Sequence, residues 1–301
     1  MKNLVLSALV PIIFTLIIAG NASSQVNPSW SIGYDFLPYQ GIDEPIEMQD
    51  GSWVDDAEVR LSKFRIAFMY PVIFSQGRTI LFNEMSYQHI GFSYHKTTSL
   101  LDKLHSIGYT LTMLHIISEK WSILAMGKSS LASDLEVDIT IEDFSFQTAA
   151  ILNRQFSQNF SVGLGAAYST QFGSGTLMPV LALDWNNGAK WSAKAIIPSS
   201  LETWYSYSPR IDFGLLITGD GDNFRFDPAS YHETAPEPEL RYTMMTVGLS
   251  TIIDLSKLVS LNFEAGIIGL HRFEFYSDDE EIVSNDLEPS HYFRLGFQSN
   301  L

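Results

Sequence analysis

The sequence predicts an all-β chain, an antiparallel up-and-down transmembrane β-barrel that follows a cleaved signal peptide. Apolar and polar residues alternate with a period of two in segments of about ten residues. The connections between these segments alternate between short and long. The last segment, 290–301, places Phe293, Leu295, Phe297 and Leu301 on one face of a strand that ends at the carboxyl terminus. An aromatic closing strand of this kind is typical of transmembrane barrels.

Residues 1–24 have the pattern of a signal peptide. A basic start precedes an uncharged apolar stretch, 4–19, and small residues stand just before Gln25, where we place the cleavage. A retained anchor helix is the alternative, but Pro11 interrupts the stretch, which is short for a bilayer helix of roughly 20 residues. We therefore expect export through a Sec-type signal and one mature barrel domain, 25–301, in the bacterial outer membrane.

Charge and cysteine usage exclude several classes of protein. No cysteine occurs, so the chain has no lipid attachment site of the lipoprotein type, no disulfide and no thiolate chemistry. Without Lys2 the mature chain has 18 − 1 = 17 basic residues against 34 acidic ones, a net charge of 17 − 34 = −17. This charge repels nucleic acid and anionic lipid headgroups, so we expect neither as a partner.

The alternation marks the strands directly. It is clearest in 160–169, where Phe160, Val162 and Leu164 alternate with small polar residues. The same pattern recurs along the chain in segments 30–36, 64–70, 190–197, 259–267 and 290–301. Between 81 and 94 the pattern changes phase, and the sequence does not show which of those residues face inward.

The connections fall into two kinds. Short ones contain the Gly, Asn and Asp residues that tight hairpins need for positive φ, and long ones are rich in acidic residues. The expected short turns are 75–78, 118–120, 153–159, 186–188, 219–223 and 254–257. The expected long loops are 41–57, 96–103, 199–208, 228–239 and 277–289. Short turns on the periplasmic side and long loops outside are the usual barrel arrangement.

The strand number follows from this count with one open point. Fourteen strands result if 223–227 belongs to an upward strand, and twelve is the alternative. The number is even because both termini lie on the same side. Pro71 and Pro179 interrupt strand-like segments, and we expect bulges or strand ends at both.

A secreted β-sandwich is the main alternative to a barrel, because it also alternates apolar and polar residues. The position of the large aromatic residues favours the barrel, since they stand near expected strand ends, as interface girdles do. These residues are Tyr34, Phe36, Tyr70, Phe92, Tyr94, Tyr168, Phe172, Trp185, Trp191, Phe273 and Phe275.

Charges within the strands select candidate lumen-lining residues. A Lys or Arg facing hydrocarbon at mid-membrane costs roughly 2–4 kcal/mol, so these side chains are expected to point inward. The candidates are Lys63, Arg65, Lys190, Lys194, Arg210, Asp212, Glu264, Arg272, Glu274 and Arg294. Their mixed signs suit either a permeation pathway or a lumen braced by ion pairs, and the sequence does not decide between these.

The long loops carry two acidic clusters, within 43–58 and 278–288. Loop-bound divalent cations that bridge to lipopolysaccharide are one interpretation, and solvated charged loops are the simpler one. The expected partners are outer-membrane lipid and lipopolysaccharide, together with the barrel-assembly machinery through the C-terminal strand. No cofactor or metal ligand set is expected.

An enzyme is not expected. Barrel lipases and proteases need a His beside a nucleophile or an acid on the outer rim. Of the seven histidines only His271, next to Arg272 and near Glu274, comes close to such a setting, and a structural histidine is the simpler reading.

Several segments resemble a family of exported bacterial proteins of the Bacteroidota type, described as a domain of unknown function. The resemblance lies in strand and turn signatures over roughly the central two thirds of the chain: 104–111, 120–123, 130–134, 152–165, 177–181 and 191–198. It implies an outer-membrane barrel and carries over no catalytic or ligand residue. We therefore expect a passive pore or small-solute transporter, with a non-transporting structural or partner-binding barrel as the alternative.

Overall fold

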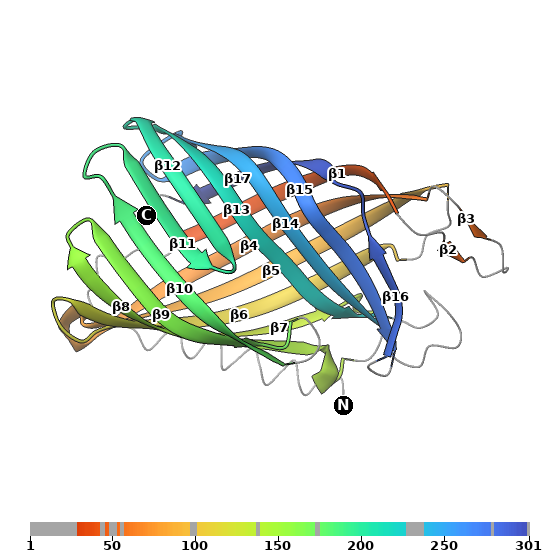
Figure 1. The fold of residues 1–301 in the computed structure, drawn as a ribbon, viewed down its shortest axis with the longest axis horizontal. Coiled ribbons are helices and arrows are strands. Elements are labelled where there is room, and N and C mark those ends of the chain that lie inside the picture. The colour runs from red at the N-terminus through yellow and green to blue at the C-terminus, as the bar shows by residue number, and fades with distance from the viewer. Residues whose placement is uncertain are drawn as a thin grey trace.

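The computed structural model is a closed antiparallel barrel of fourteen strands (Figure 1). It describes residues 29–42, 46–47, 53–54, 57–96, 101–136, 139–171, 175–226, 238–277 and 280–299. Each strand pairs with its neighbours along the chain, and pairing of β14 with β15 and of β1 with β17 completes the closure. The predicted antiparallel β-barrel and the strand number of fourteen are confirmed, and the signal peptide stays a prediction because it lies outside the described residues.

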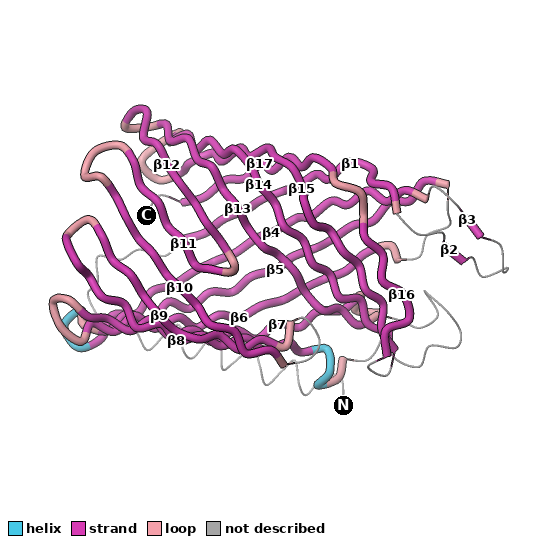
Figure 2. The backbone as a smooth tube through the Cα atoms, viewed as in Figure 1, coloured by secondary structure: helices cyan, strands magenta, loops and turns pink. Residues whose placement is uncertain are grey.

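The wall is nearly continuous strand, as Figure 2 shows. Its members are β1 (Ser29–Gly41), β4 (Glu58–Phe74), β5 (Thr79–His95), β6 (Lys103–Ile116), β7 (Trp121–Ser133), β8 (Phe144–Ser157), β9 (Phe160–Ser169), β10 (Thr176–Asn186), β11 (Trp191–Ile197), β12 (Ser200–Ser208), β13 (Ile211–Arg225), β14 (Pro238–Asp254), β15 (Val259–Ser277) and β17 (Ser290–Ser299). Three short strands lie in the long connections: β2 (Ile46–Glu47), β3 (Trp53–Val54) and β16 (Glu280–Asp286), of which β16 pairs with β15. Two 3₁₀ turns complete the described elements, η1 (Ser75–Gly77) and η2 (Ile141–Asp143).

Six short connections, at 75–78, 117–120, 158–159, 187–190, 209–210 and 255–258, lie at one end of the barrel, together with the start of β1 and the end of β17 (Figure 1). Turn chemistry explains their length. Gln76 and Gly77 adopt positive φ values of 57° and 89°, and Gly188 adopts 71°. The Asn187 Oδ1 accepts hydrogen bonds from three backbone N–H groups, those of residues 189–191, each at 3.0 Å. These backbone angles and hydrogen bonds allow the chain to reverse its direction within four residues or fewer.

The outer face carries the apolar row that the alternation predicted. Tyr34 and Phe36 on β1 are exposed, whereas the intervening Asp35 is 1% exposed. The same alternation along β4 points Phe64 and Ile66 to the outside of the barrel and Lys63 to the inside. The apolar row thus forms the outer surface of the barrel.

Two predicted connections were wrong. One error adds a strand and the other omits one, so the predicted strand number is still fourteen. Segment 219–223 is no turn, because β13 pairs with β14 without a register shift from Ile211 to Arg225. The expected strand at 223–227 is therefore the end of β13. Segment 199–208 is no loop, because Ser200–Ser208 is β12, which follows a tight turn at 198–199. The glycines and aspartates of 219–223 give this part of β13 the composition of a turn. The actual turn between β11 and β12 consists of only Pro198 and Ser199.

Neither a bulge nor a strand end, the two alternatives expected at Pro71 and Pro179, lies at these positions, since β4 continues to Phe74 and β10 starts at Thr176. Pro71 pairs with Phe82 and Pro179 with Ala166, without a register shift at either place. Within the described residues, each proline lies beyond the end of the pairing on its other side, because the pairing of β4 with β1 ends at Met69 and that of β10 with β11 starts at Leu181. A missing N–H costs nothing on an unpaired edge.

Candidate functional site: the lumen and its collar

Strand β13 touches β7 directly at the long-loop end of the barrel. Arg225 and Ser133 form a parallel bridge, and the Asp134 N–H donates to the Arg225 carbonyl at 3.2 Å. The Arg225 guanidinium also donates to Thr140 Oγ1 at 2.9 Å. This contact, which we call the seam, bypasses β8–β12 and leaves 14 − 5 = 9 strands around the lumen at that level.

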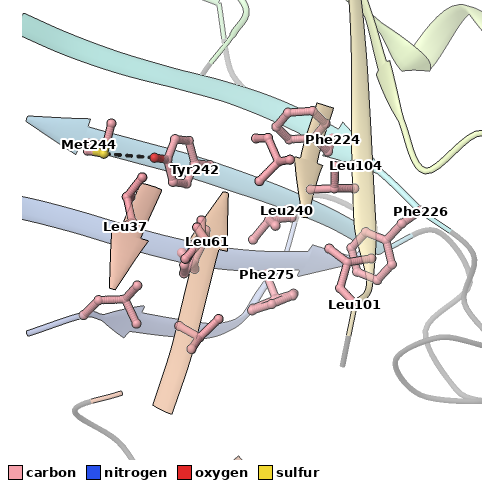
Figure 3. Packing of buried hydrophobic residues seen from close by; sticks show 14 of the residues in the cluster. Leu37, Leu61, Leu101, Leu104, Phe224, Phe226, Leu240, Tyr242, Met244 and Phe275 are labelled. Carbon is pink, nitrogen blue, oxygen red and sulfur yellow. Dashed lines mark hydrogen bonds between the residues drawn. The ribbon is translucent and has the colours of Figure 1, made fainter. Parts of the chain in front are cut away.

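We call the long-loop ends of these nine strands (β13, β14, β15, β17, β1, β4, β5, β6 and β7) the collar. Apolar side chains fill it, as Figure 3 shows. Every collar strand contributes to this buried cluster, and β8–β12 contribute no residue to it within the described part of the chain. Its members are Leu37, Val59, Leu61, Ile90, Leu101, Leu104, Ala132, Phe224, Phe226, Leu240, Tyr242, Met244, Ile268, Phe273, Phe275, Leu287 and Tyr292.

An ion network lies against the inner end of this apolar filling. Asp35 accepts from Arg65 at 2.5 Å and from Arg294 Nε at 2.9 Å. Arg294 also donates to Glu264 at 3.0 Å, and the Tyr292 hydroxyl donates to the same carboxylate. Buried carboxylates are thus matched by guanidinium groups from adjacent strands.

Polar contacts also cross the lumen between strands that are not neighbours. Lys63 on β4 donates to Asp220 on β13 at 3.0 Å, and its Nζ lies 4.2 Å from the centre of the Tyr242 ring. Ser106 on β6 donates to Asp222 on β13 at 3.0 Å. The Lys63 side chain is fully buried. Together with the apolar cluster, these contacts close the collar to a straight axial path.

The rest of the lumen, walled by all fourteen strands, is lined differently. We call it the wide lumen. On β9 its inward positions are the small residues Gly163, Gly165 and Ala167. On β10 and β11 the inward pair Asp184 and Lys194 is exposed even though both side chains point to the barrel interior. Small side chains and accessible charges leave this part of the interior open.

The wall of β8–β12, which we call the short wall, is lowest at the turn between β11 and β12, whereas β8 reaches the collar, where Phe144 pairs with Leu131. The turn between β11 and β12 meets β13 where Gly219 donates to the Ser199 carbonyl at 2.9 Å. Beyond that point β13 continues for six residues, 220–225, without a neighbour from the short wall. The wide lumen therefore reaches the long-loop side next to the collar, over the turn between β11 and β12.

The structure divides the ten predicted lumen-lining residues into three groups. Lys63, Arg65, Glu264 and Arg294 belong to the ion network of the collar, and Lys194 and Asp212 point into the wide lumen. Lys190 and Arg210 lie in short connections. Arg272 and Glu274 occupy the face of β15 opposite to His271 and Phe273, outside the collar. Whether any of these residues lines a solute path remains a prediction.

Four aromatic residues expected in the outer girdle lie inside. Phe92, Tyr94, Phe273 and Phe275 pack in or against the apolar cluster of the collar. The phase change of segment 81–94 has the same cause. β5 runs without a register shift, and its inward positions turn from polar to apolar at Ile90, where the collar begins.

His271 lies inside the collar, where its Nδ1 donates to Gln40 Oε1 at 2.5 Å. Its ring is 2% exposed and packs edge-on against Tyr242. Arg272 and Glu274 point away from it, so the neighbours in sequence that made His271 a candidate for catalysis do not face it in space.

Much of the remaining sequence prediction lies outside the described residues, including the signal peptide, Phe172 and most of both acidic clusters. Of the clusters, Glu58 pairs with His95 at 3.0 Å and Asp286 with Arg272 at 2.6 Å. The hydrogen bonds from Arg272 hold the pKa of Asp286 below its usual range. Within the described ranges no three His, Asp or Glu side chains gather as a metal site, and no helix is long and apolar enough to span a membrane.

Comparison with known proteins gives a family. A family model described as "Domain of unknown function (DUF6268)" matches residues 78–300. No curated protein sequence matches the chain. Among solved structures, the Pseudomonas putida toluene transporter TodX is 8% identical, with a TM-score of 0.44 and coverage of 95% of this chain and 93% of TodX. The KdgM porin in complex with oligogalacturonate is 9% identical, with a TM-score of 0.35 and coverage of 90% and 99%. At these identities and TM-scores, neither structure carries an inference about this chain.

Proposed function

This chain belongs to the DUF6268 family, and we propose that it is an outer-membrane barrel that passes small solutes through the wide lumen and over the short wall. The collar stays closed in this proposal. Solutes enter at the short-turn end and leave beside the collar, above the turn between β11 and β12.

The observation that carries the proposal is the contrast between the two parts of the interior. The collar is filled by a buried apolar cluster and crossed by the Lys63–Asp220 bridge. The wide lumen presents exposed Asp184 and Lys194 next to small residues of β9. An interior that only braced the barrel would be packed throughout, because voids and unpaired charges destabilise a core. A water-filled interior accepts both.

The outer surface supports a membrane location. Exposed apolar residues such as Phe64, Leu164, Leu249 and Phe263 cover strands all around the wall. Such a surface is stable only against hydrocarbon, since soluble proteins do not leave apolar patches of this extent exposed. A barrel with a lipid-facing belt and an even strand number is the form that outer-membrane proteins take.

Planar-bilayer recording tests the proposal. The purified chain is expected to show single-channel conductance, and Lys194→Glu is expected to shift the ion selectivity toward cations. Lys103→Glu serves as the matched control, because Lys103 lies on the outer face of the collar and pairs with Glu136 at 3.2 Å. A silent bilayer, or an equal shift in both variants, would refute passage through the wide lumen.

The filled collar favours a second candidate, a non-transporting barrel whose long loops or collar bind a partner. This candidate predicts no conductance and a stoichiometric partner in detergent extracts. Conductance that responds to Lys194→Glu would exclude it.

A further inference from the structure

The short-turn end of the barrel carries a ring of basic residues. Six connections lie there, at 75–78, 117–120, 158–159, 187–190, 209–210 and 255–258. Five of them contain one Lys or Arg each, and the sixth is preceded by Arg154 on β8. The ring consists of Arg78, Lys120, Arg154, Lys190, Arg210 and Lys257, all of them exposed.

Carboxylates at the same end are few, and most point elsewhere. Glu119 is the one acidic residue within the six connections. Asp184, Asp212 and Asp254 lie on nearby strand ends at positions whose side chains face the lumen. Six cations against one carboxylate give the outward rim a positive charge, although the whole chain has a net charge of −16.

The basic ring follows directly on the apolar outer belt. Exposed Phe74, Trp121, Trp191 and Tyr207 flank the turns that hold its members. Two cations lie over aromatic rings of this belt. The Arg154 guanidinium is 5.3 Å from the centre of the Trp121 ring, and Lys190 Nζ is 5.5 Å from the centre of the Tyr205 ring. Aromatic side chains of this kind mark the level of the lipid headgroups.

We propose that the basic ring binds the phosphates of anionic phospholipids, such as phosphatidylglycerol, in the leaflet that surrounds the short-turn end. The six cations are exposed in or next to turns around most of the circumference, and Arg154 and Lys190 lie over aromatic rings of the outer belt, at the level of lipid phosphates. Each Lys or Arg near an anionic membrane surface strengthens binding to it. The whole-chain charge argued against such partners, but the acidic residues that dominate it are concentrated in the long loops at the other end.

Native mass spectrometry of the full-length protein in detergent tests this proposal. The protein is mixed with equal amounts of phosphatidylglycerol and phosphatidylethanolamine, which differ in net charge. We expect the wild type to retain phosphatidylglycerol preferentially. The triple variant Lys120→Gln, Lys190→Gln and Lys257→Gln is expected to lower that preference at least fivefold.

A second triple variant is the matched control. Arg60→Gln, Lys96→Gln and Lys103→Gln remove the same number of charges at the long-loop end of the wall. Its lipid preference is expected to stay within twofold of the wild type. A heat-modifiable gel shift verifies that both variants are folded, which is expected because all three lysines of the first set are exposed turn residues.

Three results would overturn the proposal: an unchanged preference in the turn variant, an equal loss in the control, or displacement of phosphatidylglycerol by an equimolar amount of lipid A. The last result would assign the ring to the phosphates of lipopolysaccharide instead. The test does not depend on solute passage, since a barrel without conductance would keep its lipid preference.

Discussion

The two partners of the Lys63–Asp220 bridge are expected to cost different amounts of unfolding free energy when each is replaced alone. Asp220→Asn removes the closest carboxylate from a fully buried ammonium group, while Asp35, also nearby, is already bound by two arginines. Removal of one partner from a buried pair costs about 3–5 kcal/mol, and the one-third exposure of the Asp220 side chain lowers our expectation to about 2–3 kcal/mol. Lys63→Met leaves Asp220 near Arg65 and partly accessible, so we expect a cost of about 1–2 kcal/mol.

Urea unfolding in lipid vesicles, followed by the heat-modifiable gel shift, measures these free energies. The double variant Lys63→Met with Asp220→Asn is expected to be more stable than the sum of the single costs predicts, with a coupling free energy of at least about 1 kcal/mol. Additive costs, or a cost below about 0.5 kcal/mol for Asp220→Asn, would refute the bridge as a contact that closes the collar.

Three further predictions follow from the packing. Phe224→Ala in the collar core is expected to cost about 3–5 kcal/mol of unfolding free energy in the same assay without raising the conductance, because the other members of the cluster still fill the collar. Gly165→Ala is expected to impair folding, since the added Cβ would lie 2.0 Å from the Ala150 carbonyl oxygen. Gly127→Ala is expected to fold as the wild type, because no atom lies within 4 Å of its added Cβ. The yields of folded protein in the gel shift compare the two variants. Folding lowers the pKa of Asp286 below 3.8, so its ion pair with Arg272 is expected to hold β16 against β15 above pH 3.8 and to be lost as the pH falls through the folded pKa. Hydrogen exchange of β16 measures this loss. In Asp286→Asn the exchange is expected to be independent of pH.

The barrel could be predicted from the sequence because its main signal is local. A strand that separates lipid from a polar interior must alternate, so the periods in 30–36, 64–70 and 160–169 report the fold without knowledge of any partner strand. Strand ends were harder to place. The run 219–223 has the composition of a turn, yet a barrel strand above the membrane tolerates glycine and aspartate.

The collar could not be predicted, because it depends on the seam between β13 and β7, strands far apart in the chain. Only that contact makes Leu61, Ile90 and Phe273 the core of a smaller ring. One signal was present in the sequence: the apolar positions of β5 change phase at Ile90. Interpreted as a change of environment along one strand, that phase change indicates a filled interior at the long-loop end.

For charge, too, the composition of the chain does not show how its residues are arranged in space. The net charge of −16 for the whole chain does not describe the short-turn rim, where six cations stand against one carboxylate. Only the alternation of turns and loops, once assigned to ends, shows that five short connections hold one cation each.

The central claim is that the collar is closed while the wide lumen is open, and thiol labelling tests it most directly. The chain has no cysteine, so Ala182→Cys in the wide lumen and Ile90→Cys in the collar each introduce a unique thiol. With a charged, membrane-impermeant thiol reagent on the folded protein, we predict that Ala182→Cys reacts at least tenfold faster than Ile90→Cys, and that both react alike after unfolding. Equal rates in the folded state, whether both fast or both slow, would contradict the account.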